Sequence, residues 1–157
     1  MIYILIAFII VFAYVSHCVT KIGHVPSSIS QTFYLGHREF AIIIALTGTL
    51  LAIGTSEMSE TTFEAVCGVA AGSALIIVAG AAAFRIKAVR PIHVCAAIVF
   101  GASSQLWAAS VGHPALMCAW LLLPLAAGIC ETVNDNPVFS AEVWCIATTM
   151  AAAVIAC

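Results

Sequence analysis

Long apolar segments follow one another along almost the whole chain, and short polar connectors separate them. Charged residues make up only 8% of the sequence and hydrophobic residues 64%. Most side chains of each segment are therefore apolar. A transmembrane helix needs roughly 17–25 predominantly apolar residues. The segments are predicted at residues 1–19, 40–55, 63–84, 92–111, 115–130 and 143–157.

The apolar segments predict helices and not the strands of a barrel. Backbone groups without partners are too costly in lipid, which leaves helical bundles and closed barrels as spanning structures. Barrel strands alternate apolar and polar residues, whereas these segments are continuous and rich in Ala, Ile, Leu and Val. We therefore predict an all-α polytopic membrane protein, a compact bundle of about six transmembrane helices in a single domain over residues 1–157. Three segments are short, so five helices is the alternative count.

The basic residues predict how the chain is threaded. All five lie in two connectors: Lys21 and Arg38 follow the first segment, and Arg85, Lys87 and Arg90 follow the third. Alternate connectors share one side of a membrane, and Lys and Arg favour the cytoplasmic side. We predict a multi-pass protein of the bacterial inner membrane with both termini outside.

The spacing of the cysteines and the net charge give no indication of a metal site or of nucleic acid binding. The seven cysteines are scattered without the paired spacing of a metal site, so they read as small buried hydrophobes. A net charge of -2 gives no indication of nucleic acid binding. Membrane lipids are the predicted partners, together with another membrane protein or a second copy of this chain, and no cofactor is predicted.

Small residues predict where helices pack closely, because helices in lipid associate through close contact instead of hydrophobic expulsion. Gly68 and Gly72 stand one turn apart in the third segment. The fourth and sixth segments offer matching small stripes, at Ala97, Gly101 and Gln105 and at Ala147 and Ala151.

Gln105 is the most polar side chain well inside a predicted span. We expect it to face protein and to form an interhelical hydrogen bond in preference to a ligand contact. Thr47 and Thr49 of the second segment are its expected partners, unless they bond to their own backbone.

Histidines and carboxylates gather at the predicted cytoplasmic end. Such groups can hold a divalent metal or relay protons, and His17, His93 and Asp135 are the alternative metal ligands considered. Helical metal spacings such as HxxxH are missing from the sequence. The preferred interpretation is that a chain with few polar residues carries most of them in the loops at the membrane interface.

The first connector, residues 24–34, is long for so small a protein and combines hydroxyl groups with an aromatic pair. It predicts a segment that folds back over the inner mouth of the bundle, with Phe33 and Tyr34 at headgroup level. Its hydroxyl groups and the nearby Arg38 are candidates for binding a lipid phosphate or another anion. A short amphipathic helix is the structural alternative.

Three short motifs carry a resemblance to a known family. Residues 26–34, the pair Ile92-His93 and the run Ser104-Gln105-Leu106-Trp107 resemble small multi-helix membrane proteins of Bacteroidetes and their phages, a family without an established activity. In that family a tyrosine stands where this chain has Phe33. The resemblance directs attention to Ser28, Ser30, Tyr34, His93, Gln105 and Trp107 as binding candidates.

These observations favour a non-enzymatic membrane protein that binds or transports a lipid, a small solute or a partner. One alternative is a metal-dependent enzyme acting on lipid at the cytoplasmic interface, where a metal would activate water. The other is a phage-encoded lysis or host-membrane factor.

Overall fold

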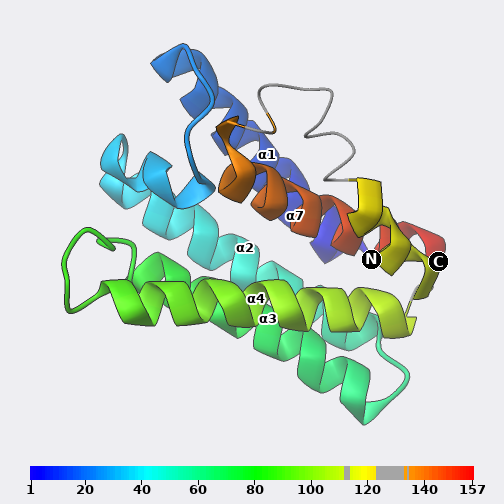
Figure 1. The fold of residues 1–157 in the computed structure, drawn as a ribbon. Coiled ribbons are helices and arrows are strands. Elements are labelled where there is room, and N and C mark those ends of the chain that lie inside the picture. The colour runs from blue at the N-terminus through cyan, green and yellow to red at the C-terminus, as the bar shows by residue number, and fades with distance from the viewer. Residues whose placement is uncertain (112–113, 123–132, 134) are drawn as a thin grey trace.

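The computed structural model describes residues 1–111, 114–122, 133 and 135–157, and within these ranges every regular element is helical (Figure 1). In chain order the elements are α1 (Ile2–Ile22), the 3₁₀ helix η1 (Ile29–Tyr34), α2 (His37–Met58), α3 (Thr62–Gly80), α4 (Arg90–Val111), the 3₁₀ helix η2 (Pro114–Leu121) and α7 (Pro137–Ile155).

Five of these helices, α1, α2, α3, α4 and α7, are long and apolar enough to cross a membrane. The all-α class is thereby confirmed. The predicted fifth segment, residues 115–130, overlaps η2, and residues 123–130 lie outside the described residues, as does Pro124. A sixth helix therefore stays a prediction.

Local sequence signals explain several helix ends. Thr61 and Glu64 form a capping box at the start of α3, in which each side chain accepts a hydrogen bond from the other's backbone N–H. Pro91 lies in the first turn of α4, where a missing N–H costs nothing. Gly23 ends α1 with φ +79°, a conformation that favours glycine.

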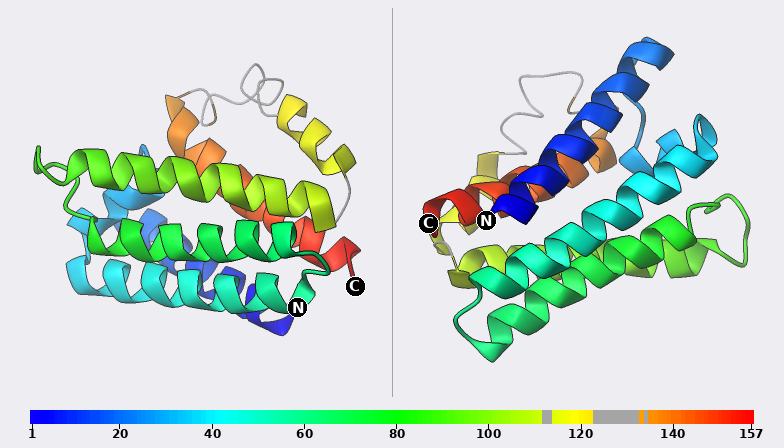
Figure 2. Two further views of the ribbon diagram at one scale, coloured as in Figure 1. Left: turned by 90° about the horizontal axis from the view of Figure 1, so that it is seen from below. Right: turned by 180° about the vertical axis from the view of Figure 1, so that it is seen from behind.

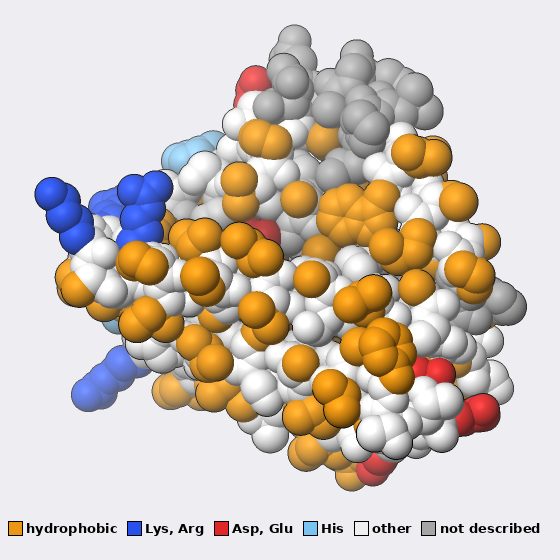
Figure 3. All heavy atoms as spheres, turned by 60° about the horizontal axis from the view of Figure 1, so that its bottom comes forward, with side chains coloured by type: hydrophobic (Ala, Val, Ile, Leu, Met, Phe, Trp, Pro, Cys, Tyr) orange, Lys and Arg blue, Asp and Glu red, His pale blue; other side chains and the backbone are white. Residues whose placement is uncertain are grey.

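The two ends of the bundle differ in charge. The basic residues lie near the end of α1, the start of α2 and the loop between α3 and α4, and Figure 3 shows Lys and Arg gathered at one end with several acidic side chains near the other. Both chain termini lie together at the end away from the cations (Figures 1 and 2). Hence α4 ends at one end of the bundle and α7 begins at the other, and residues 112–136 connect them.

Glycines of α2 and α3 allow these two helices to approach closely. A Cβ atom added at Gly48 would lie 2.5 Å from the carbonyl oxygen of Gly72, and one added at Gly72 would lie 2.6 Å from the Cβ of Ala52. Gly68 packs in the same way against Thr55. The predicted small face of the third segment is confirmed, but its closest partner is α2.

The matching stripes predicted on the other helices are only partly correct. Gly101 and Gln105 of α4 face α7, where a Cβ atom added at Gly101 would lie 3.8 Å from the Sγ of Cys145. On α7 Ala147 is exposed, and Ala152 and Ala153 are the buried small residues. A stripe of small residues permits close contact without specifying which helix makes it.

We expect Gly72→Ala to lower the stability of the protein, because its new methyl group meets the backbone of α2. Overpacking of this kind costs about 1–3 kcal/mol. Thermal unfolding of the purified protein in detergent measures the effect. Gly80→Ala is the matched control, because a Cβ atom at Gly80 has no neighbour within 4 Å. Equal melting temperatures for the two variants would contradict the proposed α2–α3 contact.

Candidate functional site

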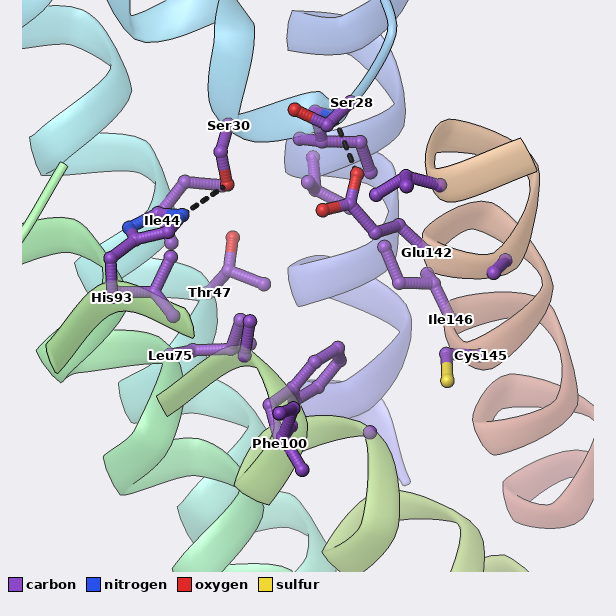
Figure 4. A pocket seen from close by; sticks show the side chains of 18 of the residues that line it. Ser28, Ser30, Ile44, Thr47, Leu75, His93, Phe100, Glu142, Cys145 and Ile146 are labelled. Atoms are coloured by element: carbon purple, nitrogen blue, oxygen red, sulfur yellow. Dashed lines mark hydrogen bonds between the residues drawn. The ribbon is translucent and has the colours of Figure 1, made fainter. Parts of the chain in front are cut away.

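A cavity of about 850 Å³ lies between α1, α2, α3, α4 and α7. Its wall is mostly apolar and includes Ile44, Leu75, Phe100 and Ile146 (Figure 4). Polar side chains are few and lie toward the first connector. Enclosed pockets of roughly 300–1,000 Å³ with a few polar groups are typical of small-molecule sites.

The first connector covers one end of this cavity. Ser28 caps η1 by accepting a hydrogen bond from the N–H of Gln31, and Ile29, Ser30 and Thr32 are buried. The Tyr14 hydroxyl of α1 donates to the carbonyl oxygen of Thr32 at 3.4 Å. The connector thus packs back onto the bundle as a short 3₁₀ helix, whereas its predicted place at the inner mouth and at headgroup level stays a prediction.

The connector is also joined to α7. The backbone N–H of Ile29 donates to Oε2 of Glu142 at 2.5 Å, and the N–H of Phe139 donates to the carbonyl oxygen of Ser27 at 3.1 Å. A hydrogen bond to a carboxylate is stronger than one between neutral groups. These contacts hold the start of α7 against the connector, and the Glu142 side chain lines the cavity (Figure 4).

His93 of α4 links the first connector to the end of α3. Its Nδ1 lies 3.1 Å from the carbonyl oxygen of Ala81, and its Nε2 lies 3.0 Å from Oγ of Ser30 (Figure 4). Because a carbonyl oxygen only accepts, Nδ1 carries the proton, and Nε2 of the neutral ring then accepts the Ser30 hydroxyl hydrogen. His93 and Ser30, both singled out from the sequence, are thus brought together at the cavity.

Gln105 forms the interhelical hydrogen bonds that the sequence predicted. Its Oε1 accepts from Thr148 of α7 and from Nε1 of Trp120 in η2, each at 2.8 Å, and its Nε2 donates to the carbonyl oxygen of Cys145 at 3.2 Å. The expected partners were wrong. Thr47 and Thr49 bond to carbonyl oxygens of their own helix, which was the stated alternative.

The remaining candidates lie apart from the cavity. The Tyr34 hydroxyl accepts from the backbone N–H of Arg85, whose guanidinium stacks 4.1 Å from the Tyr34 ring centroid. Arg38 is exposed. Trp107 is fully buried and donates from Nε1 to the Ser59 hydroxyl at 3.1 Å, which makes it part of the packing between α4 and the end of α2.

The alternative metal ligands do not converge. His17 and Asp135 are exposed, whereas His93 is buried under the connector. Among the residues that the structure describes, no three His, Cys, Asp or Glu side chains are grouped as metal ligands.

Glu142 was placed from the sequence among the interfacial carboxylates near the histidines, but was not chosen as a binding or metal candidate; the structure puts it in the cavity wall. The last apolar segment was predicted to begin at residue 143, which left this carboxylate outside the span. The structure begins α7 at Pro137, so Glu142 lies inside the helix. Pro137 after Asn136 is the available signal, because proline is common in the first turn of a helix.

No protein-family model, curated protein or solved structure matches the chain. The resemblance to the Bacteroidetes and phage family therefore stays a prediction.

We expect Glu142→Ala to release the connector from α7, because it removes the acceptor of the Ile29 N–H. A hydrogen bond to a charged group contributes roughly 1.5–3 kcal/mol, so the amides of Ile29–Tyr34 should exchange with deuterium at least about tenfold faster. Hydrogen exchange followed by mass spectrometry measures this rate. Glu142→Gln keeps an acceptor oxygen and should protect these amides far better. Unchanged exchange in both variants would show that the contact does not hold the connector.

Proposed function

We propose that this protein is a non-enzymatic integral membrane protein that binds an apolar or amphipathic small molecule in the cavity between α4 and α7. The cavity carries the proposal: it is mostly apolar, of ligand size, and has a small polar end. A molecule with an apolar body and one polar group would match that division.

The rim of the cavity supports access from the bilayer. Val94 and Ile98 of α4 and Val138 of α7 line the cavity and are also exposed, by 44%, 65% and 56%. Exposed apolar side chains on a membrane helix face hydrocarbon. A ligand dissolved in the lipid would therefore reach the cavity between these two helices without crossing a polar barrier.

The bacterial inner membrane is the proposed location, with both termini outside. The clustering of all the Lys and Arg residues near one end of the bundle supports this orientation, since cationic loops favour the cytoplasmic side. The two termini share the other end (Figures 1 and 2).

Binding is favoured over hydrolysis although Ser30 and His93 have the spacing of a nucleophile and its base. A hydrolase stabilises the negative charge that develops on the substrate carbonyl oxygen. Here the Glu142 carboxylate faces the same cavity and opposes such charge. The Ser30–His93 hydrogen bond instead anchors the connector.

We expect the neutral amphiphile decanol to protect Cys145 from N-ethylmaleimide, because this thiol lines the cavity. The experiment uses variants that keep Cys145 or Cys95 as the single cysteine, reconstituted in lipid nanodiscs. Cys95 lies exposed on α4 outside the cavity lining and is the matched control. Saturating decanol should slow alkylation of Cys145 severalfold and leave that of Cys95 unchanged. Equal effects on the two thiols, or none on Cys145, would contradict binding in the cavity.

A further inference from the structure

Two hydroxyl groups at the polar end of the cavity, those of Ser30 and Thr47, offer lone pairs and no free hydrogen. The Ser30 hydroxyl hydrogen is directed to Nε2 of His93, and the Thr47 hydroxyl donates to the carbonyl oxygen of Ile43 at 2.8 Å. Each hydroxyl has one hydrogen, so what remains on both oxygens is lone pairs. Both side chains line the cavity (Figure 4).

Glu142 adds a stronger acceptor on the opposite wall. An ionised carboxylate accepts hydrogen bonds at both oxygens and donates none. Oε2 accepts the Ile29 N–H, and Oε1 has no hydrogen-bond partner among the described residues. Glu142 therefore has acceptor capacity left for a group inside the cavity.

Within the described residues, no lysine or arginine neutralises this carboxylate. All five Lys and Arg residues belong to the described part of the chain, and none of them forms an ion pair with Glu142. Arg90 lines the cavity, but it is exposed at the cationic end of the bundle. A carboxylate within an apolar region is costly unless it is paired, and such residues in membrane spans commonly mark ligand or ion sites.

We propose that the ligand carries a primary amine, held as an ammonium by Glu142 with Ser30 and Thr47 as further acceptors. This inference rests on the proposed function and names the head group of its ligand. An ammonium supplies three N–H donors and a positive charge, which match the acceptors and the unpaired carboxylate. A carboxylate or phosphate head group would bring a second negative charge to Glu142.

The test compares three ligands with the same chain and different head groups: decylamine, decanol and decanoate. Isothermal titration measures their binding to the protein in phosphatidylcholine nanodiscs, and empty nanodiscs correct for partition into lipid. We expect decylamine to bind at least about tenfold more tightly than the other two, because its hydrogen bonds are charge-assisted. The ranking in the unaltered protein needs no variant to interpret.

Variants then assign the preference to Glu142. Glu142→Gln should remove the advantage of decylamine over decanol, and Glu142→Asp should retain part of it. Glu57→Gln changes an exposed acidic residue outside the cavity and should leave the advantage intact. Melting temperatures of all variants identify any that fail to fold.

Two sets of outcomes separate this inference from the function on which it rests. Similar affinities for the three ligands, tighter binding of decanoate, or an amine preference that survives in a folded Glu142→Gln variant would overturn the amine assignment. The cavity would then still be a binding site. Heats equal to those of empty nanodiscs for all three ligands would overturn the proposed function itself.

Discussion

The hydrogen bond from the Ile29 N–H to Glu142 is the contact on which the arrangement of the connector and α7 around the cavity rests. It holds the connector and the start of α7 together, so the connector covers one end of the cavity. Farther along α7, Gln105 joins the helix to α4 through Thr148 and Cys145. The cavity lies along this part of α7 and is lined by residues of the helix from Pro137 to Thr149.

The two groups of polar residues inside the bundle differ in how fully they are satisfied. The amide of Gln105 uses both its oxygen and its nitrogen on α7 and η2, which is what a structural contact in lipid requires. The polar end of the cavity has the opposite character. The hydroxyl hydrogens of Ser30 and Thr47 are used within the protein, and the Glu142 carboxylate forms no ion pair with a described residue, so these groups have acceptors to offer a ligand.

The sequence predicted what depends on apolar length and on single polar residues within it. The apolar runs predicted helices that the structure contains, and an isolated glutamine in such a run predicted an interhelical hydrogen bond. Prediction from the sequence failed where it had to say which helices or side chains meet in the folded protein. Gly68 and Gly72 indicated close packing but not that α2 is the neighbour, and His17, His93 and Asp135 share an end of the bundle without converging. Glu142 was placed in an interfacial loop and not in a helix, because hydropathy excludes a carboxylate from a span that its helix nevertheless includes.

Native mass spectrometry of the protein released from its own membrane in a mild detergent tests the central claim most directly. The account predicts the mass of the chain plus one small basic amphiphile. It also predicts that this additional mass disappears in Ala97→Phe, whose ring would fill the cavity, and persists in Val99→Phe, whose ring would point outward from the same helix. A chain that carries no such molecule, or one that carries it equally in both variants, would contradict the account.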